Sequence, residues 1–371
     1  MKGKIALFAL FVALVFGVVA YLPSKQEPAP KNLIYMIGDG MGLSHVAMMM
    51  IEGGYQPTAF DRMENIALIS SYSANNRVTD SAAGGTALAT GHKTNNGMVG
   101  MTPDSLPVES ILTRAKERGA ATGIVVTCEV QHATPASFYA HVPHRGRYDE
   151  ISHQLAASGV DLVLGGGRTS MVEPDTMHSE NLSPLAQMEQ VGYRSIDDLA
   201  ALDSLTDEKV IGLFSEGHLP SKLAGRDDFL SQAVASSLRY LEGRAAERKE
   251  GFVLMVEGSQ IDFESHGNNT PGILAEVRDF EQAVAAAMRY VEAHPETLLV
   301  VTADHETGGL TMASGNSDFT SSESGIEYRY STGSHTGILV PVYLYGRGAE
   351  RINGVMDNTE LSRKLAELMN L

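Results

Sequence analysis

The chain has 371 residues, of which 43% are hydrophobic and 20% charged, and its formal net charge is -17. This composition is typical of a globular protein and excludes a wholly disordered one, and the length allows two domains or one large α/β domain. The acidic balance argues against nucleic acid as a partner, and it implies that a site for an anionic substrate needs strong local cations.

The N-terminal segment differs from the rest of the chain. Two lysines precede an apolar run, Ile5–Leu22, and Ala20 ends a small-residue pattern that is typical of a signal cleavage site. We therefore expect a signal peptide at residues 1–20, a linker at 21–31, and export to the periplasm or the medium. An uncleaved segment that tethers the protein to the inner membrane is the alternative. No other contact with a membrane is expected.

Apolar β-rich runs alternate with helical patterns along the body of the chain. We predict strands at Asn32–Ile37, Ile66–Tyr72, Thr122–Cys128, Val160–Leu164, Phe252–Val256, Thr297–Thr302 and Val340–Tyr345. We predict helices at 82–91, 108–118, 149–158, 229–241, 273–291 and 361–368. Weak patterning at residues 168–225 indicates a variable insertion, and residues 314–334 are interpreted as a loop insertion.

This alternation predicts one α/β catalytic domain over residues 32–371. The expected fold is doubly wound, with a mostly parallel central sheet and helices on both faces, in three α/β/α layers. Cys128 is the only cysteine, which excludes an intrachain disulfide. It ends a predicted strand, so we expect it to be a small buried hydrophobic side chain.

Acidic residues follow three of the predicted strands. Asp39 comes after the first, Glu257 after Phe252–Val256, and Asp304 with His305 after Thr297–Thr302. Ligands of open α/β sheets bind beyond the carboxyl ends of the strands. We therefore expect these side chains to line a functional site.

Asp80 and Ser81 stand directly before the small-residue run at 82–91. The N-terminus of a helix presents free N–H groups and favours negative charge. A serine there can cap the helix, or it can attack an electrophile whose charge the helix end stabilises. This stretch alone leaves both alternatives open.

Several aspartate and histidine residues have a spacing that suits zinc. Asp262 and His266 are four residues apart, so one helical turn places them on the same face. Asp304 and His305 are adjacent at a strand end, and His335 lies between small residues that can present an imidazole. Nitrogen and oxygen ligands of this kind are those of zinc sites.

A second set of candidate ligands supplies only oxygen. Asp39, Glu257 and the hydroxyl of Thr134 belong to it. Hard oxygen ligands suit magnesium. Each residue alone also has an ordinary structural interpretation, as a strand-end carboxylate or a surface histidine.

Together these stretches resemble the alkaline phosphatase family. The resemblance is carried by Val78–Thr86, Ile37–Gly42, His132–Ala136, Glu257–Asp262 with His266, and Asp304–Gly309. It runs from about Asn32 to the last predicted strand, with gaps in 168–225. It implies hydrolysis of phosphate monoesters through a phosphoserine intermediate, two zinc ions and one magnesium ion as cofactors, and a homodimer.

The resemblance also implies a role for each motif residue. Ser81 would be the nucleophile and Arg145 would grip the phosphate, since a guanidinium can bind two phosphate oxygens at once. The implied ligand sets are Asp262, His266 and His335 for the first zinc, Asp39, Asp304 and His305 for the second, and Asp39, Thr134 and Glu257 for magnesium.

Two positions depart from the best-known bacterial pattern of the family. His132 stands where an aspartate is frequent, and Phe263 where a lysine or another aromatic residue is frequent. With Asp80, these residues are expected to surround the site. Because histidine is a poorer partner for hydrated magnesium than a carboxylate, His132 leaves the identity of the third metal open. A metal-dependent phosphodiesterase and a non-catalytic exported metal- or phosphate-binding protein are the alternative functions.

Overall fold

Ten strands form a single sheet in the computed structural model, which describes residues 28–173, 182–205, 208–315 and 325–371. In sheet order the strands are β14 (Gly354–Asp357), β2 (Asn65–Ser70), β13 (Val340–Gly346), β8 (Thr297–Thr302), β1 (Asn32–Gly38), β7 (Phe252–Gly258), β3 (Ala121–Glu129), β4 (Leu162–Gly166), β6 (Lys209–Leu213) and β5 (Tyr193–Ile196). Strand β13 is antiparallel to both of its neighbours, and the other pairings are parallel. The mostly parallel sheet is therefore confirmed.

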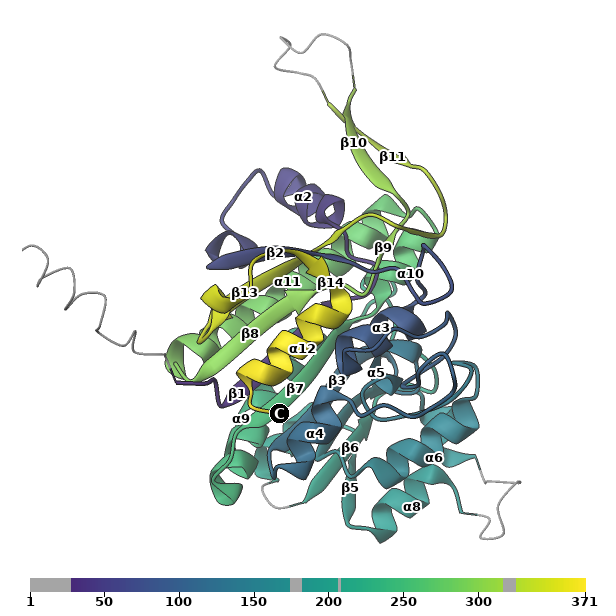
Figure 1. Ribbon diagram of the computed structural model, residues 1–371, viewed down its shortest axis with the longest axis vertical. Helices are drawn as coiled ribbons and strands as arrows, with labels where there is room; N and C mark the ends of the chain where they lie inside the picture. Colours follow the sequence, from purple (N-terminus) through teal and green to yellow (C-terminus); the bar gives the residue numbers. More distant parts are fainter. Residues whose placement is uncertain (1–27, 174–181, 206–207, 316–324) are drawn as a thin grey trace, which may run out of the picture.

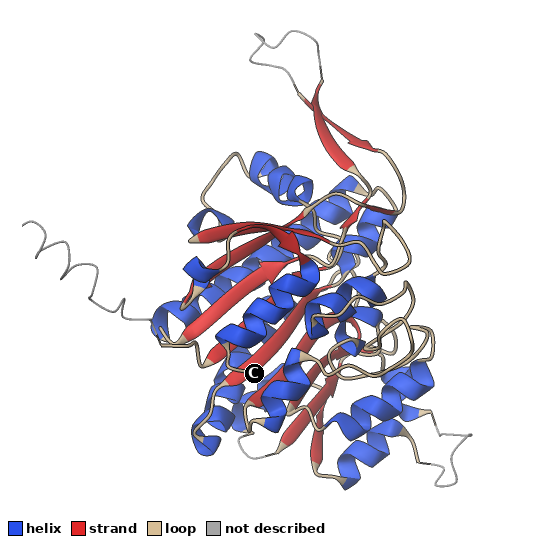
Figure 2. Cartoon of the chain, in the orientation of Figure 1, coloured by secondary structure: helices blue, strands red, loops and turns tan. Residues whose placement is uncertain are grey.

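Helices cover both faces of this sheet, as Figure 1 and Figure 2 show. One face carries α2 (Leu43–Glu52), α9 (Phe229–Arg248) and α11 (Thr270–Ala293), and the other carries α3 (Ser81–Thr90), α4 (Ile111–Glu117) and α12 (Asn358–Leu368). The remaining helices are α5 (Ala133–Ala136), α6 (Tyr148–Ser158), α7 (Arg168–Val172), α8 (Pro184–Gln190) and α10 (Gln260–His266), with 3-10 turns η1 (Phe60–Arg62), η2 (Leu199–Ser204) and η3 (Ala349–Arg351). The three-layer α/β/α architecture is confirmed.

The sequence pattern of the long helices explains their packing. Ile273, Val277, Phe280 and Val284 recur every three or four residues in α11, and all are fully buried. This spacing makes one apolar stripe along a helix. All seven residues of β1 and of β7 are also buried, as expected of parallel strands covered on both faces.

Two weakly patterned regions contain more structure than the sequence indicated. Within 168–225, strands β5 and β6 extend the main sheet next to β4. The prediction of a loop at 314–334 is wrong for Ile326–Tyr330, which forms β11 and pairs with β10 (Leu310–Ser314) in a projecting hairpin (Figure 1). The residues of β11 alternate between apolar and polar, which is a strand pattern, but the segment was grouped with the polar loop around it. It belongs to a separate two-stranded sheet with little burial.

The N-terminal predictions fall mainly outside the described residues. The signal peptide at 1–20 and most of the linker lie there. Among the residues that the structure describes, no helix is both long enough and apolar enough to cross a membrane.

Candidate active site

The carboxyl ends of three neighbouring strands bring the predicted acidic residues together. Strand β1 lies between β7 and β8 and is parallel to both. Glu257 pairs in register with Ile37 near the end of β1, and Asp39 follows directly after this strand. Asp304 follows β8 at the same edge. The edge predicted from the sequence is the one at which the side chains meet.

Asp262, His266 and His335 form a first group of candidate cation ligands. One ligand atom of each lies within 4.8 Å of the others. Asp262 and His266 are one turn apart in α10, with His266 Nε2 3.3 Å from Asp262 Oδ2. His335 belongs to β12 (His335–Thr336), which pairs with β9 (Glu306–Thr307) and so holds the imidazole over α10.

The tautomers of the two histidines favour a cation between them. The Nδ1 atoms of His266 and His335 each lie 2.8 Å from a backbone carbonyl, of Gly333 and Thr79 respectively. A carbonyl only accepts hydrogen bonds, so each Nδ1 atom carries a proton, and in the neutral form of each ring the lone pair is on Nε2. These Nε2 atoms are 3.1 Å apart. Two facing lone pairs with their Nδ1–H groups fixed by carbonyls are typical of metal-binding histidines.

A second group consists of Asp39, Asp304 and His305, all completely buried. His305 Nε2 lies 3.4 Å from Asp39 Oδ1 and 3.3 Å from Asp304 Oδ2. The other oxygen of Asp304 accepts hydrogen bonds from the backbone N–H groups of Gly40 and His305. These bonds fix the carboxylate so that one oxygen points into the group.

Ser81 is the first residue of α3 and faces the second group. Asp80 is the N-cap, because its side chain accepts a hydrogen bond from the N–H of Ala83 at 3.0 Å. The Ser81 hydroxyl is therefore not used as the cap and lies 3.2 Å from His305 Nε2. The helix packs closely here, since a Cβ atom on Gly84 would lie 2.9 Å from the carbonyl oxygen of Asp304.

Arg145 lies beside this helix terminus, with only part of its side chain exposed. Its Nη1 atom is 3.4 Å from Asp80 Oδ2, and its Nη2 atom is 3.0 Å from His132 Nε2. The rings of His132, Phe263 and His218 pack edge-on or tilted against each other next to it. Asp80 and His132 thus contact Arg145, and Phe263 packs against His132.

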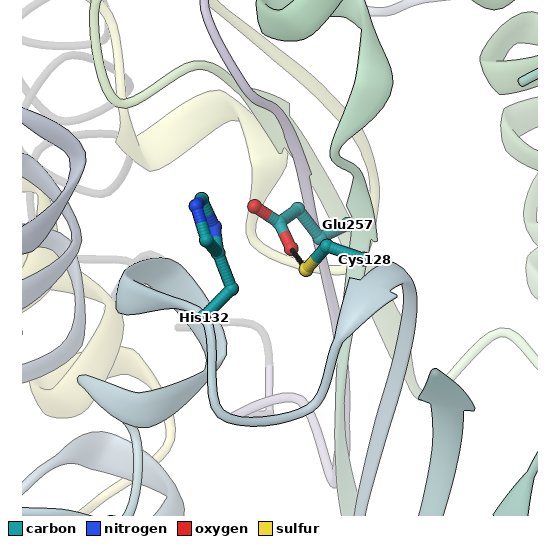
Figure 3. A group of neighbouring side chains, drawn as sticks. All are labelled: Cys128, His132 and Glu257. Carbon is teal, nitrogen blue, oxygen red and sulfur yellow. Dashed lines mark hydrogen bonds between the residues drawn. The ribbon is translucent and has the colours of Figure 1, made fainter. Parts of the chain in front are cut away.

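Thr134 and Glu257 face the space beside Asp39. The Thr134 hydroxyl, Glu257 Oε1 and both oxygens of Asp39 lack a hydrogen-bond partner among the described residues, although all three residues are fully buried. Cys128 and His132 also border this space (Figure 3). Buried polar atoms are rarely left unpaired, so these oxygens are suited to bind a cation.

Burial and mutual repulsion perturb the carboxylates. Burial raises the pKa of Asp39 well above its usual value, and the charges of Asp304, Asp262 and Glu257 add to this shift. Burial likewise raises the pKa of Asp304 to about 7 and raises the pKa of Glu257. Several acids that hold their protons tightly in one buried cluster indicate that cations normally supply the compensating charge.

Two of the imidazoles are shifted toward the neutral form that metal binding requires, and a third is shifted the other way. Burial lowers the pKa of His305 well below its usual value, and burial together with Arg145 lowers the pKa of His132 to about 3. Both rings are therefore neutral at physiological pH, as a metal ligand must be. The hydrogen bond with Asp262 raises the pKa of the more exposed His266 to about 9.

The donor sets present fit the predicted cations. The first two groups offer imidazole nitrogen and carboxylate oxygen, which suits zinc. Asp39, Thr134 and Glu257 offer oxygen alone, which suits magnesium.

Sequence reasoning missed three contributors to the site. Thr307 contacts Asp262 Oδ1 and lies 3.2 Å from His305 Nδ1, so it bridges the first two groups. His218 comes from the weakly patterned region and accepts from the N–H of Glu129 at 3.0 Å. Cys128 is buried as predicted, but its sulfur contacts Glu257 rather than only apolar atoms. Only the motif Asp304–Gly309 carried a signal for one of them, Thr307.

Comparisons with known proteins agree with this site. Residues 30–329 match the family model described as alkaline phosphatase. The chain is 31% identical to alkaline phosphatase 4 of Bacillus subtilis (strain 168), with 100% of this chain and 97% of the relative covered. It is 30% identical to alkaline phosphatase of Escherichia coli (strain K12), with 91% and 86% covered.

Solved structures show the same similarity. Alkaline phosphatase from the Antarctic bacterium TAB5 superposes with a TM-score of 0.84 at 34% identity, covering 93% of this chain and 99% of that one. A His 135 Asp mutant of the TAB5 enzyme, with Mg bound in its M3 site, superposes with the same TM-score, identity and coverage. Because the family model matches most of this chain, the chain is a phosphatase that belongs to the alkaline phosphatase family.

Proposed function

We propose that the chain hydrolyses phosphate monoesters to an alcohol and inorganic phosphate, with Ser81 as the nucleophile and a phosphoserine intermediate. The observation that carries this proposal is the position of the Ser81 hydroxyl, 3.2 Å from His305 Nε2 at the first residue of α3. A relative from Streptomyces griseus, 31% identical over 97% of this chain, is named streptomycin-6-phosphate phosphatase. Its name describes action on a phosphate monoester, which supports this substrate class.

Two zinc ions would be held by the first two groups of ligands. Asp262, His266 and His335 would hold one, and Asp39, Asp304 and His305 the other. When bound, such a pair of cations lowers the pKa of a nearby hydroxyl and stabilises the attacking and leaving oxygens of an in-line displacement.

The chain's own residues would orient the reaction. Asp80 caps α3 and leaves the Ser81 hydroxyl free, so the oxygen can attack phosphorus in line with the leaving alcohol. Arg145 would turn from Asp80 and His132 to bind two phosphate oxygens. The free N–H groups at the start of α3 would add to the stabilisation of the negative charge.

A magnesium ion would occupy the third position, held by Asp39, Thr134 and Glu257. The unpaired oxygens of these residues support this assignment. His132 stands beside them, and two TAB5 relatives with Mg in their M3 site are mutants in which a histidine is replaced by Glu or Asp. We therefore expect His132 to weaken magnesium binding without preventing it.

The test is hydrolysis of a chromogenic phosphate monoester at alkaline pH by the chain loaded with zinc and magnesium, alongside the corresponding diester. We expect the monoester to be the better substrate, and chelation to abolish its turnover. Ser81→Ala should lose about 1,000-fold or more in kcat while keeping its zinc, since removal of a nucleophile can cost this much.

Ser137→Ala provides a matched control. Ser137 is another fully buried serine that contacts α3 through the carbonyl of Ala82, but it does not face the cation ligands. Its variant should remain active. Faster hydrolysis of the diester would favour the phosphodiesterase, and retained activity in Ser81→Ala would rule out the phosphoserine route.

Three features remain predictions. They are export to the periplasm or the medium, a homodimer, and a single catalytic domain at 32–371 with a variable insertion near 168–225. Export rests on the sequence of residues 1–22. Sedimentation of the purified chain and N-terminal sequencing of the exported product would test the dimer and the cleavage site.

A further inference from the structure

Cys128 places a sulfur atom at the third position of the active site. It lies near the end of β3 and is fully buried, and its Sγ atom is 3.2 Å from Glu257 Oε2. Figure 3 shows the thiol and the carboxylate side by side, with the ring of His132 across from them. The ligand atoms of Cys128, His132 and Glu257 lie within 4.8 Å of one another.

Two unpaired polar atoms beside Cys128 indicate that this group of side chains can bind a ligand. Glu257 Oε1 and His132 Nδ1 are buried, and both lack a hydrogen-bond partner among the described residues. The other glutamate oxygen accepts from the Ser259 hydroxyl at 2.7 Å, which fixes the carboxylate in place. Unpaired nitrogen and oxygen beside a sulfur form an incomplete coordination set.

The chemistry of this set differs from that of the magnesium ligands. Thiolate and imidazole are ligands of zinc and related thiophilic cations, whereas magnesium takes hard oxygen ligands. Glu257 belongs to both sets. Because the carboxylate has one fixed position, an ion bound through Cys128 and His132 would compete with magnesium for it.

We propose that the third position is a metal-selection site, at which a thiophilic divalent cation binds Cys128, His132 and Glu257 and displaces magnesium. The inference rests on the proposed assignment of Glu257 to magnesium. On binding, the Cys128 thiol loses its proton to solvent and the sulfur–metal bond replaces the hydrogen bond to Glu257.

The hydrogen bond between Arg145 and His132 links the choice of cation at the third position to phosphate binding by Arg145. While His132 Nε2 accepts from Arg145, the proton of the neutral ring is on Nδ1. When Arg145 turns to phosphate, Nε2 can carry that proton and Nδ1 has a lone pair for the cation. Binding of the thiophilic ion therefore requires Arg145 to leave His132.

Cadmium is a suitable probe, because Cys128 is the only cysteine and neither predicted zinc site contains sulfur. Thiolate-to-cadmium absorption in the ultraviolet would report on Cys128 alone. Cadmium is titrated into the zinc- and magnesium-loaded chain with phosphate present, while absorption and protein-bound magnesium are measured. We expect one equivalent of thiolate-bound cadmium to appear as one equivalent of magnesium leaves.

Cys128→Ser keeps the shape of the side chain but replaces its sulfur with oxygen. In this variant the absorption should be absent, and magnesium release should need at least about tenfold more cadmium. The absorption of the unmodified chain decides the matter even where the variant fails to fold. Bound cadmium without thiolate absorption, or thiolate absorption with magnesium retained, would overturn the proposal.

This result does not depend on ester hydrolysis. Absorption and metal content report on Cys128 even where the chain prefers a diester, so failure of the monoester proposal is seen separately in the hydrolysis assay.

Discussion

Two clusters of buried charge lie at opposite ends of the central strands, and they are balanced in different ways. At the amino ends of β3 and β4, Asp161 forms ion pairs with Arg244 and Arg248 and accepts from the N–H of Thr122 at 3.0 Å. At the carboxyl ends, Asp39 and Asp304 have His305 as their ion-pair partner in the described part of the chain. Burial lowers the pKa of that histidine, so it supplies no positive charge.

The difference separates a structural cluster from a functional one. The Asp161 carboxylate receives its compensating charge from the chain, and the two guanidinium groups and the Thr122 N–H lower its pKa despite burial. The carboxylates of Asp39 and Asp304 at the other end have no positively charged partner among the described residues, and burial raises the pKa of both. Folding leaves this second cluster incomplete, which is what a site for external cations requires.

Asp304→Asn should give the largest effect. It should impair the metal-loaded chain but stabilise the metal-free chain. We expect a loss of at least about 100-fold in kcat/KM with reduced zinc content. Loss of a residue that only contacts a metal ligand can already cost about 10–100-fold, and Asp304 is proposed to bind the metal itself. With metal removed by chelation at pH 8, the variant should melt above the unmodified chain, because one repelling charge is gone. One kcal/mol corresponds to roughly 2–4 °C in Tm for a domain of about 150–250 residues, and to a smaller shift in a longer chain such as this one.

The asparagine can keep the fixed hydrogen bonds of Asp304. Its side-chain oxygen can still accept from the N–H groups of Gly40 and His305. Its amide can face Asp39, whose oxygens are unpaired. A lower Tm of the metal-free variant would contradict the interpretation of a repelling cluster.

Asp161→Asn tests the balanced cluster and should mainly affect stability. Removing one partner of a buried ion pair leaves the other charges uncompensated, at a cost of about 3–5 kcal/mol. We expect the lower end, about 3 kcal/mol, because Arg248 is partly exposed. Denaturant unfolding measures the loss. The folded variant should keep its zinc content and its kcat, and a selective loss of zinc would show that the two ends are coupled.

The sequence was most informative where strand ends and motif residues coincide. The apolar runs of β1, β7 and β8 each lead to an acidic residue, and the parallel pairing of these strands places the residues together. The two groups proposed to bind zinc contain the predicted residues. Their residues come from four separate segments, so the family resemblance was needed to sort them into sets.

Features that depend on distant contacts could not be predicted. His335 was expected only to lie between small residues, but its bridge to β9 fixes it, and a two-residue strand leaves no periodic pattern. Cys128 ends an apolar run, and nothing in its neighbours indicates a carboxylate from β7. Thr307 contacts Asp262 across 45 positions of sequence. Each of these contacts is a consequence of topology and not of local composition.

The two clusters should also give opposite pH dependences of stability in the metal-free chain. The folded-state pKa of Asp304 is raised from 3.8 to about 7, so its stabilisation is present below pH 4 and is lost as the pH rises through 7. The pKa of Asp161 is lowered from 3.8, so its stabilisation is present above that pH and is lost as the pH falls through the folded-state pKa.

Melting curves in chelator between pH 5 and 8 should therefore show Tm falling with pH, with a slope of up to about 1.4 kcal/mol per pH unit for one proton. Asp304→Asn should reduce this slope, and the raised pKa values of Asp39, Glu257 and His266 would account for what remains. With zinc present the slope should reverse, because the metal binds deprotonated ligands. An unchanged slope on adding zinc would argue against these carboxylates as ligands.

His132→Asp should have the smallest effect, an increase in magnesium affinity of about tenfold. It adds a carboxylate at the end of the sheet where Asp39 and Asp304 have no positively charged side chain as a partner in the described part of the chain. Magnesium also prefers oxygen to imidazole nitrogen. Bound magnesium and activity are measured across a magnesium titration at fixed zinc, with His132→Asn as the control of equal size without the charge. Only the aspartate should tighten binding, because the added charge and not the smaller side chain attracts the ion. Activity that does not respond to magnesium in His132→Asp would mean that the third position is not a magnesium site in this chain. At this end of the sheet, only the two groups proposed to bind zinc would then need cations.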